Sequence, residues 1–135
     1  SMDEDLDHLK QKIDAGADFL VTQMFFDNDY YWDFLDHAVQ KGIGTRIIPG
    51  IIPITNYSQI KRFAEISGAK IPDDIEKKLA AVQNDKNKVY ELGLEIAKQQ
   101  SLDLLKNGAP GIHVFTLNKS RAAIKLYHHI PEIYK

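Results

Sequence analysis

Residues 19–26 read Phe-Leu-Val-Thr-Gln-Met-Phe-Phe and carry the clearest structural signal in the chain. The stretch is short and almost continuously apolar, and the turn residues Asp27, Asn28 and Asp29 follow it. A run of this kind is typical of a strand that is buried on both faces of a parallel sheet. The triplet can cap a helix, which we expect over residues 30–41, with Gly42 ending it.

On either side of this strand, the sequence repeats the alternation of short apolar runs and amphipathic segments. One helix is predicted before it, over residues 3–15, where apolar residues recur every three or four positions. Further strands are predicted over 46–52 and 111–117, and further helices over 57–66, 72–82, 86–106 and after Asn118. The pair Thr55-Asn56 can cap the helix over 57–66, and Asp85 can cap the helix over 86–106. Strands that alternate with helices indicate parallel pairing with right-handed crossovers, so we predict an α/β fold.

The chain has 135 residues, which fits one domain over residues 3–135. Ser1 and Met2 resemble a protease-cleavage remnant and a start methionine, and we leave them out of the fold prediction. An eight-stranded α/β barrel needs about 250 residues, so this chain is too short to form one. Its three predicted strands also cannot close a barrel by themselves. Two sheet edges remain, and we therefore expect either a part of something larger or a chain that pairs with itself.

Composition excludes several classes of function. Lys and Arg number 17 and Asp and Glu 19, so the net charge of −2 gives no electrostatic basis for binding nucleic acid or an anionic membrane. Without cysteine there is no thiolate metal site and no cysteine nucleophile. His128 and His129 have no third ligand at a suitable spacing, so no metal site is predicted.

Ligands of parallel α/β folds bind beyond the carboxyl ends of the strands. The predicted ends carry mostly amides, hydroxyls and aromatic rings, which suit a polar aromatic ligand. Gln23 is unusual within an apolar strand, because a buried amide needs partners; it either contacts a ligand or makes a structural hydrogen bond. His113 could equally be a core residue or a site residue.

Five motifs together resemble one family. They are Ala15-Gly16-Ala17-Asp18, Thr22-Gln23-Met24-Phe25-Phe26-Asp27, Ile48-Pro49-Gly50-Ile51-Ile52-Pro53-Ile54, Asn56-Tyr57 and His113-Val114-Phe115-Thr116-Leu117-Asn118. In this order and spacing they resemble methylenetetrahydrofolate reductase, over residues 5–130.

The resemblance implies a flavin-containing eight-stranded α/β barrel (a TIM barrel). This chain matches its carboxy-terminal part, roughly the last three strands with their helices. The implied reaction uses NAD(P)H to reduce FAD, which then reduces 5,10-methylenetetrahydrofolate to 5-methyltetrahydrofolate in one-carbon and methionine metabolism. A cytoplasmic location is expected from the family, and the implied partners are the folate and the missing amino-terminal barrel half. The free sheet edges, independently of the resemblance, offer a second copy of the chain as a further partner.

The resemblance also implies binding roles for individual residues. Gln23 matches the glutamine that hydrogen-bonds the folate pterin and the nicotinamide carboxamide, and Gln59 matches another substrate-contacting glutamine. Phe63 matches an aromatic position that stacks on folate or the dinucleotide. Lys119 stands where the family usually has a substrate-contacting arginine, and it keeps the charge without the planar fork.

The predicted first helix carries the implied FAD contacts. Lys12 matches a lysine near the FAD phosphates, and Asp5, His8 and Gln11 match neighbouring positions that line the FAD. Asp5, His8 and Lys12 are spaced three and four apart, which puts them on one helix face. Without the resemblance, that face would be interpreted as an ordinary solvated stripe.

The family's general-acid glutamate comes from the early barrel strands, which this chain does not match. We therefore assign no catalytic residue here and expect the chain alone to be inactive. Two alternatives stay open. The chain could be a non-catalytic module that self-associates through its sheet edges, or part of another TIM-barrel enzyme that uses the same strand ends.

Overall fold

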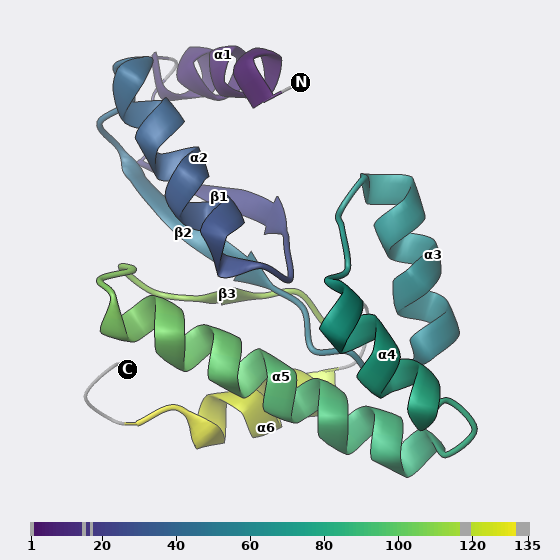
Figure 1. The fold of residues 1–135 in the computed structure, drawn as a ribbon. Coiled ribbons are helices and arrows are strands. Elements are labelled where there is room, and N and C mark those ends of the chain that lie inside the picture. Colours follow the sequence, from purple (N-terminus) through teal and green to yellow (C-terminus); the bar gives the residue numbers. More distant parts are fainter. Residues whose placement is uncertain (1, 15, 17, 117–119, 132–135) are drawn as a thin grey trace.

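The computed structural model describes residues 2–14, 16, 18–116 and 120–131, which form an α/β fold (Figure 1). The elements follow one another as α1 (Met2–Asp14), β1 (Phe19–Met24), α2 (Asn28–Gln40), β2 (Arg46–Ile51), α3 (Tyr57–Ser67), α4 (Asp73–Ala81), α5 (Lys86–Lys106), β3 (His113–Val114) and α6 (Ser120–His129). The predicted order of strands and helices is therefore confirmed.

The three strands form one sheet in the order β1-β2-β3, and both neighbouring pairs are parallel. Phe19 lies opposite Arg46, and the register shifts near the carboxyl end, where Met24 lies opposite Gly50. Gly50 in turn lies opposite His113. Parallel pairing brings the carboxyl ends of all three strands to the same edge of the sheet, where the loops leading into the helices begin.

The core consists of two apolar clusters. The larger one packs residues of β1 and β2 against α2, α5 and α6 and includes Leu20, Ile47, Ile51, Phe34 and Leu126. The second lies beyond the strand ends, where Met24 and Phe26 meet Ile60 of α3, Leu79 of α4 and Val89 of α5. The second cluster anchors α3 and α4 beside the sheet edge that carries the candidate site (Figure 1).

Helix caps lie where the sequence predicts them. Asp27 caps α2 by accepting a hydrogen bond from the Asp29 backbone, and Asn56 caps α3 by accepting one from Gln59. Asp85 does the same for α5, accepting from Asn87 and Lys88. Gly68 ends α3 with φ 76°, a left-handed conformation that costs glycine little.

The prediction that the first strand is buried on both faces is wrong. Leu20 and Thr22 are buried, but Phe19 is 55% exposed and Gln23 is exposed too. Successive side chains of a strand point to opposite faces. The helices therefore cover the face that carries Leu20 and Thr22, and the face that carries Phe19 and Gln23 is left open in the described structure.

The third strand is shorter than the predicted 111–117. Only His113 and Val114 form the strand, and the Phe115 N–H adds one further bond to the Ile51 carbonyl, at 2.8 Å. At its carboxyl end the strand stops because β2 ends at Ile51. At its amino end the register places Pro49, which has no N–H to donate, opposite the residue before His113. The predicted positions from Leu117 to Lys119 lie outside the described residues.

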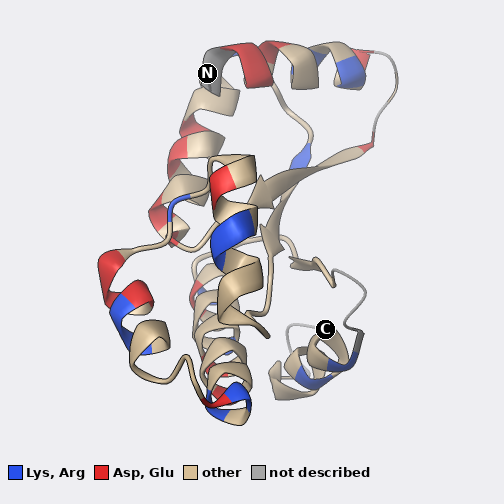
Figure 2. Ribbon diagram, turned by 90° about the vertical axis from the view of Figure 1, so that its right-hand side faces the viewer, with Lys and Arg blue, Asp and Glu red and all other residues tan. Residues whose placement is uncertain are grey.

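Charged residues lie mainly on the helices, whereas the strands are almost free of them (Figure 2). On α2 the acidic residues Asp29, Asp33 and Asp36 are all exposed. On α1 acidic residues gather in the first half and Lys10 and Lys12 follow in the second half, and Asp7 forms an ion pair with Lys41 at 3.2 Å. Electrostatics therefore act mostly at the outer surface and at the loops beyond the strand ends.

Candidate functional site

The end of β1 is held in place by a buried hydroxyl. Thr22 Oγ1 accepts a hydrogen bond from the Gly50 N–H at 2.9 Å and donates to the Gln23 carbonyl at 2.9 Å. Because Thr22 points into the core, its neighbour Gln23 points to the open face. An amide that can donate and accept is thus presented at the carboxyl edge of the sheet.

The loop that follows β1 is fixed by contacts with α5. The Gln100 side chain donates to the Phe25 carbonyl at 2.9 Å, in a buried bond. The Asn28 amide donates to the Gln100 carbonyl at 3.1 Å and to the Asp103 carboxylate at 2.7 Å. No local pattern in the sequence marks these contacts, because the paired residues lie more than 70 positions apart along the chain.

Gln23 lines a cavity of about 370 Å³ at this edge. Tyr30 and Asp33 of α2 form one wall, and residues 67–70 at the end of α3 form another. Burial raises the pKa of the Tyr30 phenol, and the negative charge of Asp5 raises it further. Asp5 of α1 is therefore close enough to act electrostatically on a residue of the Gln23 cavity.

Gln59 and Phe63 lie one turn apart on α3, and both line a second hollow of about 450 Å³. Each is half-buried, and Phe63 also packs against the second core cluster. The Ser67 hydroxyl donates to the Phe63 carbonyl at 2.8 Å, and Ser67 itself lines the Gln23 cavity. The same helix therefore contributes to both hollows.

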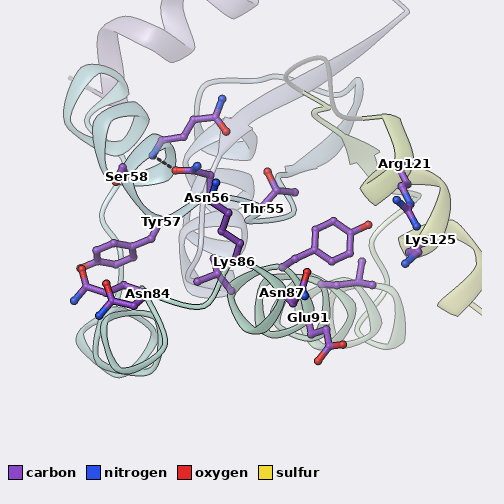
Figure 3. Close-up of a pocket in the computed structure, with 15 residues that line it drawn as sticks. Thr55, Asn56, Tyr57, Ser58, Asn84, Lys86, Asn87, Glu91, Arg121 and Lys125 are labelled. Atoms are coloured by element: carbon purple, nitrogen blue, oxygen red, sulfur yellow. Dashed lines mark hydrogen bonds between the residues drawn. The ribbon is translucent and has the colours of Figure 1, made fainter.

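The third cavity is the largest, at about 1040 Å³, and lies between the first turns of α3, α5 and α6 (Figure 3). Gln59 lines it as well, and so joins it to the hollow that Phe63 lines. Its other polar side chains include Asn56, Lys86, Arg121 and Lys125. No pattern in the sequence analysis singled out Arg121 or Lys125.

The residues of α1 matched to FAD contacts are all exposed. Asp5, His8, Gln11 and Lys12 lie on the solvent side of a helix whose Leu6 is fully buried. The structure thus brings Gln59 and Phe63 together, places Gln23 in a separate cavity, and places the α1 residues on another surface. Lys119 lies outside the described residues.

Other kinds of site find no support in the described structure. Its residues contain no group of three or more His, Cys, Asp or Glu side chains that could hold a metal ion. Within the same ranges, no helix is both long and apolar enough to cross a membrane. His113 is exposed and packs edge-on against the Phe115 ring, with 4.8 Å between ring centroids.

This arrangement defines an α/β protein with hollows, lined by candidate binding residues, beyond the carboxyl ends of its parallel strands. The sequence model of the family described as methylenetetrahydrofolate reductase matches residues 1–131. The chain belongs to this family.

Individual relatives agree with this assignment. The chain is 37% identical to methylenetetrahydrofolate reductase (NADH) 1 of Arabidopsis thaliana over 124 residues, which cover 92% of the chain and 21% of the relative. It is 36% identical to 5,10-methylenetetrahydrofolate reductase of Salmonella typhimurium over 128 residues, which cover 95% of the chain and 43% of the relative. The chain therefore spans less than half the length of these relatives.

A solved structure shares the fold. It is described as an uncharacterized protein from Clostridium thermocellum that binds two copies of 5-methyl-5,6,7,8-tetrahydrofolic acid. The TM-score is 0.56 at 22% identity, and the match covers 90% of this chain and 46% of that one.

Proposed function

We propose that the chain is part of a flavin-dependent oxidoreductase that reduces 5,10-methylenetetrahydrofolate to 5-methyltetrahydrofolate with NAD(P)H. The observation that carries the proposal is the position of Gln23 in a chain that belongs to this family. Its amide stands exposed at the carboxyl end of β1, on the face that the described helices leave open. The folate-binding description of the Clostridium thermocellum protein lends support at the level of the fold.

The three strands are proposed to be the carboxy-terminal part of a TIM barrel. In such a barrel the inner face of each strand is covered by other strands across the barrel. The open face of β1, with Phe19 and Gln23, would be that inner face. The relatives are more than twice the length of the matched region, which is long enough to supply the other strands.

Folate binding is assigned to the residues at the strand ends. A pterin ring presents alternating donors and acceptors along one edge, and the Gln23 amide can pair with both kinds of group. Gln59 adds a second amide, and Phe63 offers a partly exposed ring for stacking. Lys119 is proposed to contact the substrate as a single positive charge.

The α1 surface fits a flavin dinucleotide in its chemistry. Among the described residues, the Lys12 ammonium has no ion-pair partner, so it is available to a phosphate. His8 and Gln11 add hydrogen-bonding groups on the same exposed surface. When bound, FAD supplies hydride transfer between NAD(P)H and the folate, whereas these residues would bind and orient it.

The proposal assigns no general acid to this chain. The exposed glutamates Glu65, Glu91 and Glu95 lie on helices and line none of the Gln23 cavity. We therefore expect the 135 residues alone to show no turnover, and we assign the reaction to a longer cytoplasmic polypeptide that acts in one-carbon metabolism.

The test is a flavin assay of the intact polypeptide. We expect FAD absorbance in the purified protein, bleaching by NAD(P)H without oxygen, and reoxidation by 5,10-methylenetetrahydrofolate. Lys12→Ala should weaken FAD binding by about tenfold, the value of one charge-assisted contact. Lys10→Ala is the matched control, because Lys10 lies on the same helix next to Gly42. A flavin-free protein, or equal effects of the two variants, would contradict the proposal.

A further inference from the structure

Gln23 stands in the least regular part of β1. The pairing of β1 with β2 shifts its register between Val21 and Met24, which lie on either side of the Thr22-Gln23 pair. A regular ladder fixes each residue through the neighbouring strand, whereas a register shift leaves the backbone locally less constrained. The orientation of the Gln23 amide therefore depends on contacts that the ladder itself does not make.

Helix α5 makes such contacts with the loop that follows β1. The Gln100 side chain is only 8% exposed and donates to the Phe25 carbonyl at 2.9 Å. At the other end of the loop, the Asn28 amide donates to the Gln100 carbonyl at 3.1 Å and to the Asp103 carboxylate at 2.7 Å. Gln100 and Asp103 lie one turn apart on α5, so one helix face holds both ends of the loop.

The loop that α5 holds forms one wall of the Gln23 cavity. Phe25, Asp27 and Tyr30 line this cavity together with Gln23. The Phe25 ring also packs against the rings of Tyr30 and Tyr31, with 5.5 Å and 6.2 Å between the ring centroids. A displacement of the Phe25 backbone would therefore move both the wall of the cavity and the end of the strand that carries Gln23.

Gln100 can affect the Gln23 cavity only through this loop. It is not among the described residues that line the cavity, and it lines instead a hollow of about 550 Å³ beside α5. Phe26 and Asp27 line both hollows. A buried amide costs free energy unless it is hydrogen-bonded, so an apolar side chain would suit this position better if α5 only had to pack against the loop.

We propose that Gln100, together with Asn28, is a positioning residue of the Gln23 site. Gln100 holds the Phe25 carbonyl and Asn28 holds the start of α2, so that the Gln23 amide is presented to the ligand in one fixed orientation. Neither residue contacts the ligand. The inference rests on the proposed function, in which the ligand of Gln23 is the folate.

The test is a double-mutant cycle on folate affinity. The dissociation constant of 5-methyltetrahydrofolate is measured for the intact flavin-loaded protein and for Gln100→Met, Gln23→Ala and the double variant Q23A/Q100M. Methionine has nearly the shape of glutamine but lacks its N–H donor. We expect Gln100→Met to weaken binding by about tenfold in the unaltered background and by less than about twofold when Gln23 is already alanine. A residue that only stabilised the fold would weaken binding equally in both backgrounds, or not at all.

Two matched controls remove similar groups without touching the loop. Gln99→Met changes the neighbouring glutamine, whose amide donates to Glu95 of the same helix at 2.9 Å. Asn107→Ala removes the hydrogen bonds that Asn107 donates to Asp103 at the end of α5. Both proteins should bind the folate as tightly as the unaltered protein does, with the same FAD content.

Asn28→Ala tests the second anchor of the loop. Asn28 is half-buried at the start of α2, so this variant is expected to fold even if Gln100→Met does not. We expect it to weaken folate binding by about threefold, and again only while the Gln23 side chain is present. Where Gln100→Met does not fold, the cycle between Asn28→Ala and Gln23→Ala decides in the same way.

The contrary outcomes have distinct meanings. Unchanged folate affinity in the loop variants, or equal losses with and without the Gln23 side chain, overturns the positioning role and leaves the proposed function standing. If the unaltered protein binds no folate, the proposed function is overturned and the positioning role with it.

Discussion

Thr22 and Gln23 are neighbours on β1 with opposite surroundings. Thr22 is buried and ties β1 to β2 through the Gly50 N–H, whereas Gln23 is exposed on the open face. The sequence singled out Gln23 because an amide is unusual within an apolar run. It did not reveal that the hydroxyl beside it fixes the strand, since that bond depends on a residue 28 positions away.

Among the described residues, Tyr31 has the largest fully buried side chain, and its hydroxyl donates to the Ile47 carbonyl at 2.7 Å. Tyr31→Phe removes this bond and leaves the shape of the core almost unchanged. We expect the free energy of unfolding to fall by about 1–2 kcal/mol, measured by urea denaturation. Tyr30→Phe is the control, because Tyr30 is 36% exposed and lies next to Tyr31 in the chain. An unchanged stability would contradict the structural role of the hydroxyl.

The same tyrosine makes the stability of the folded chain depend on pH. Burial raises the pKa of Tyr31 to about 12, above its ordinary value of 10.0. The folded state then holds the phenolic proton more tightly than the unfolded state does, so stability is fully present below pH 10 and is lost as the pH rises towards 12. Denaturation midpoints should fall over this window, and they should fall less in Tyr31→Phe.

At the scale of elements, the sequence predicted features that depend on neighbouring residues, but it did not predict features that depend on residues far apart in the chain. The capping side chains Asp27, Asn56 and Asp85 act within three residues, and the sequence predicted all of them. The prediction of a strand over residues 111–117 was too long, because its ends depend on the residues of β2 that lie opposite them, Pro49 on one side and the strand end at Ile51 on the other. The sequence did not indicate the large cavity lined by Lys86, Arg121 and Lys125, because three helices far apart in the sequence form it.

Gly93 marks the closest approach between α5 and the loop that follows β2. A side chain there would collide with the Ile54 backbone, just before the Thr55–Gln59 wall of the large cavity. Alanine favours a helix by up to about 1 kcal/mol over glycine, but overpacking costs about 1–3 kcal/mol. We therefore expect Gly93→Ala to lower thermal stability.

The control for this substitution is Gly111→Ala, because nothing lies within 4 Å of a Cβ built at Gly111. A Gly93→Ala protein that is as stable as the Gly111→Ala protein would show that α5 can move away from the loop without cost.

At the scale of the whole molecule, the open face of the sheet is the main departure from a self-contained domain. Phe19 is 55% exposed, and Val21 and Ile48 are only half-buried. The sequence predicted two free sheet edges, and the described strands do form an open sheet in the order β1-β2-β3. It did not predict the open face, because the apolar run of β1 indicated a strand buried on both faces. No local pattern in the sequence indicates which polypeptide covers this face.

We expect the isolated 135-residue chain to self-associate through this face. Its mass in analytical ultracentrifugation should rise with concentration, and Phe19→Lys should reduce the association because it charges the apolar surface. Val39→Lys is the matched control, because Val39 is 73% exposed on α2. A chain that stays monomeric at every concentration would contradict this expectation.

The proposed folate site at Gln23 is tested most directly by measuring folate affinity with and without its side chain. The dissociation constant of 5-methyltetrahydrofolate should be determined for the intact flavin-loaded protein, for Gln23→Ala and for Gln40→Ala, whose side chain is exposed at the end of α2. We predict that Gln23→Ala lowers the affinity for 5-methyltetrahydrofolate by about tenfold to a hundredfold and that Gln40→Ala leaves it unchanged. The FAD content should be the same in all three proteins. Equal affinities in all three proteins would contradict the assignment of the folate site to the end of β1.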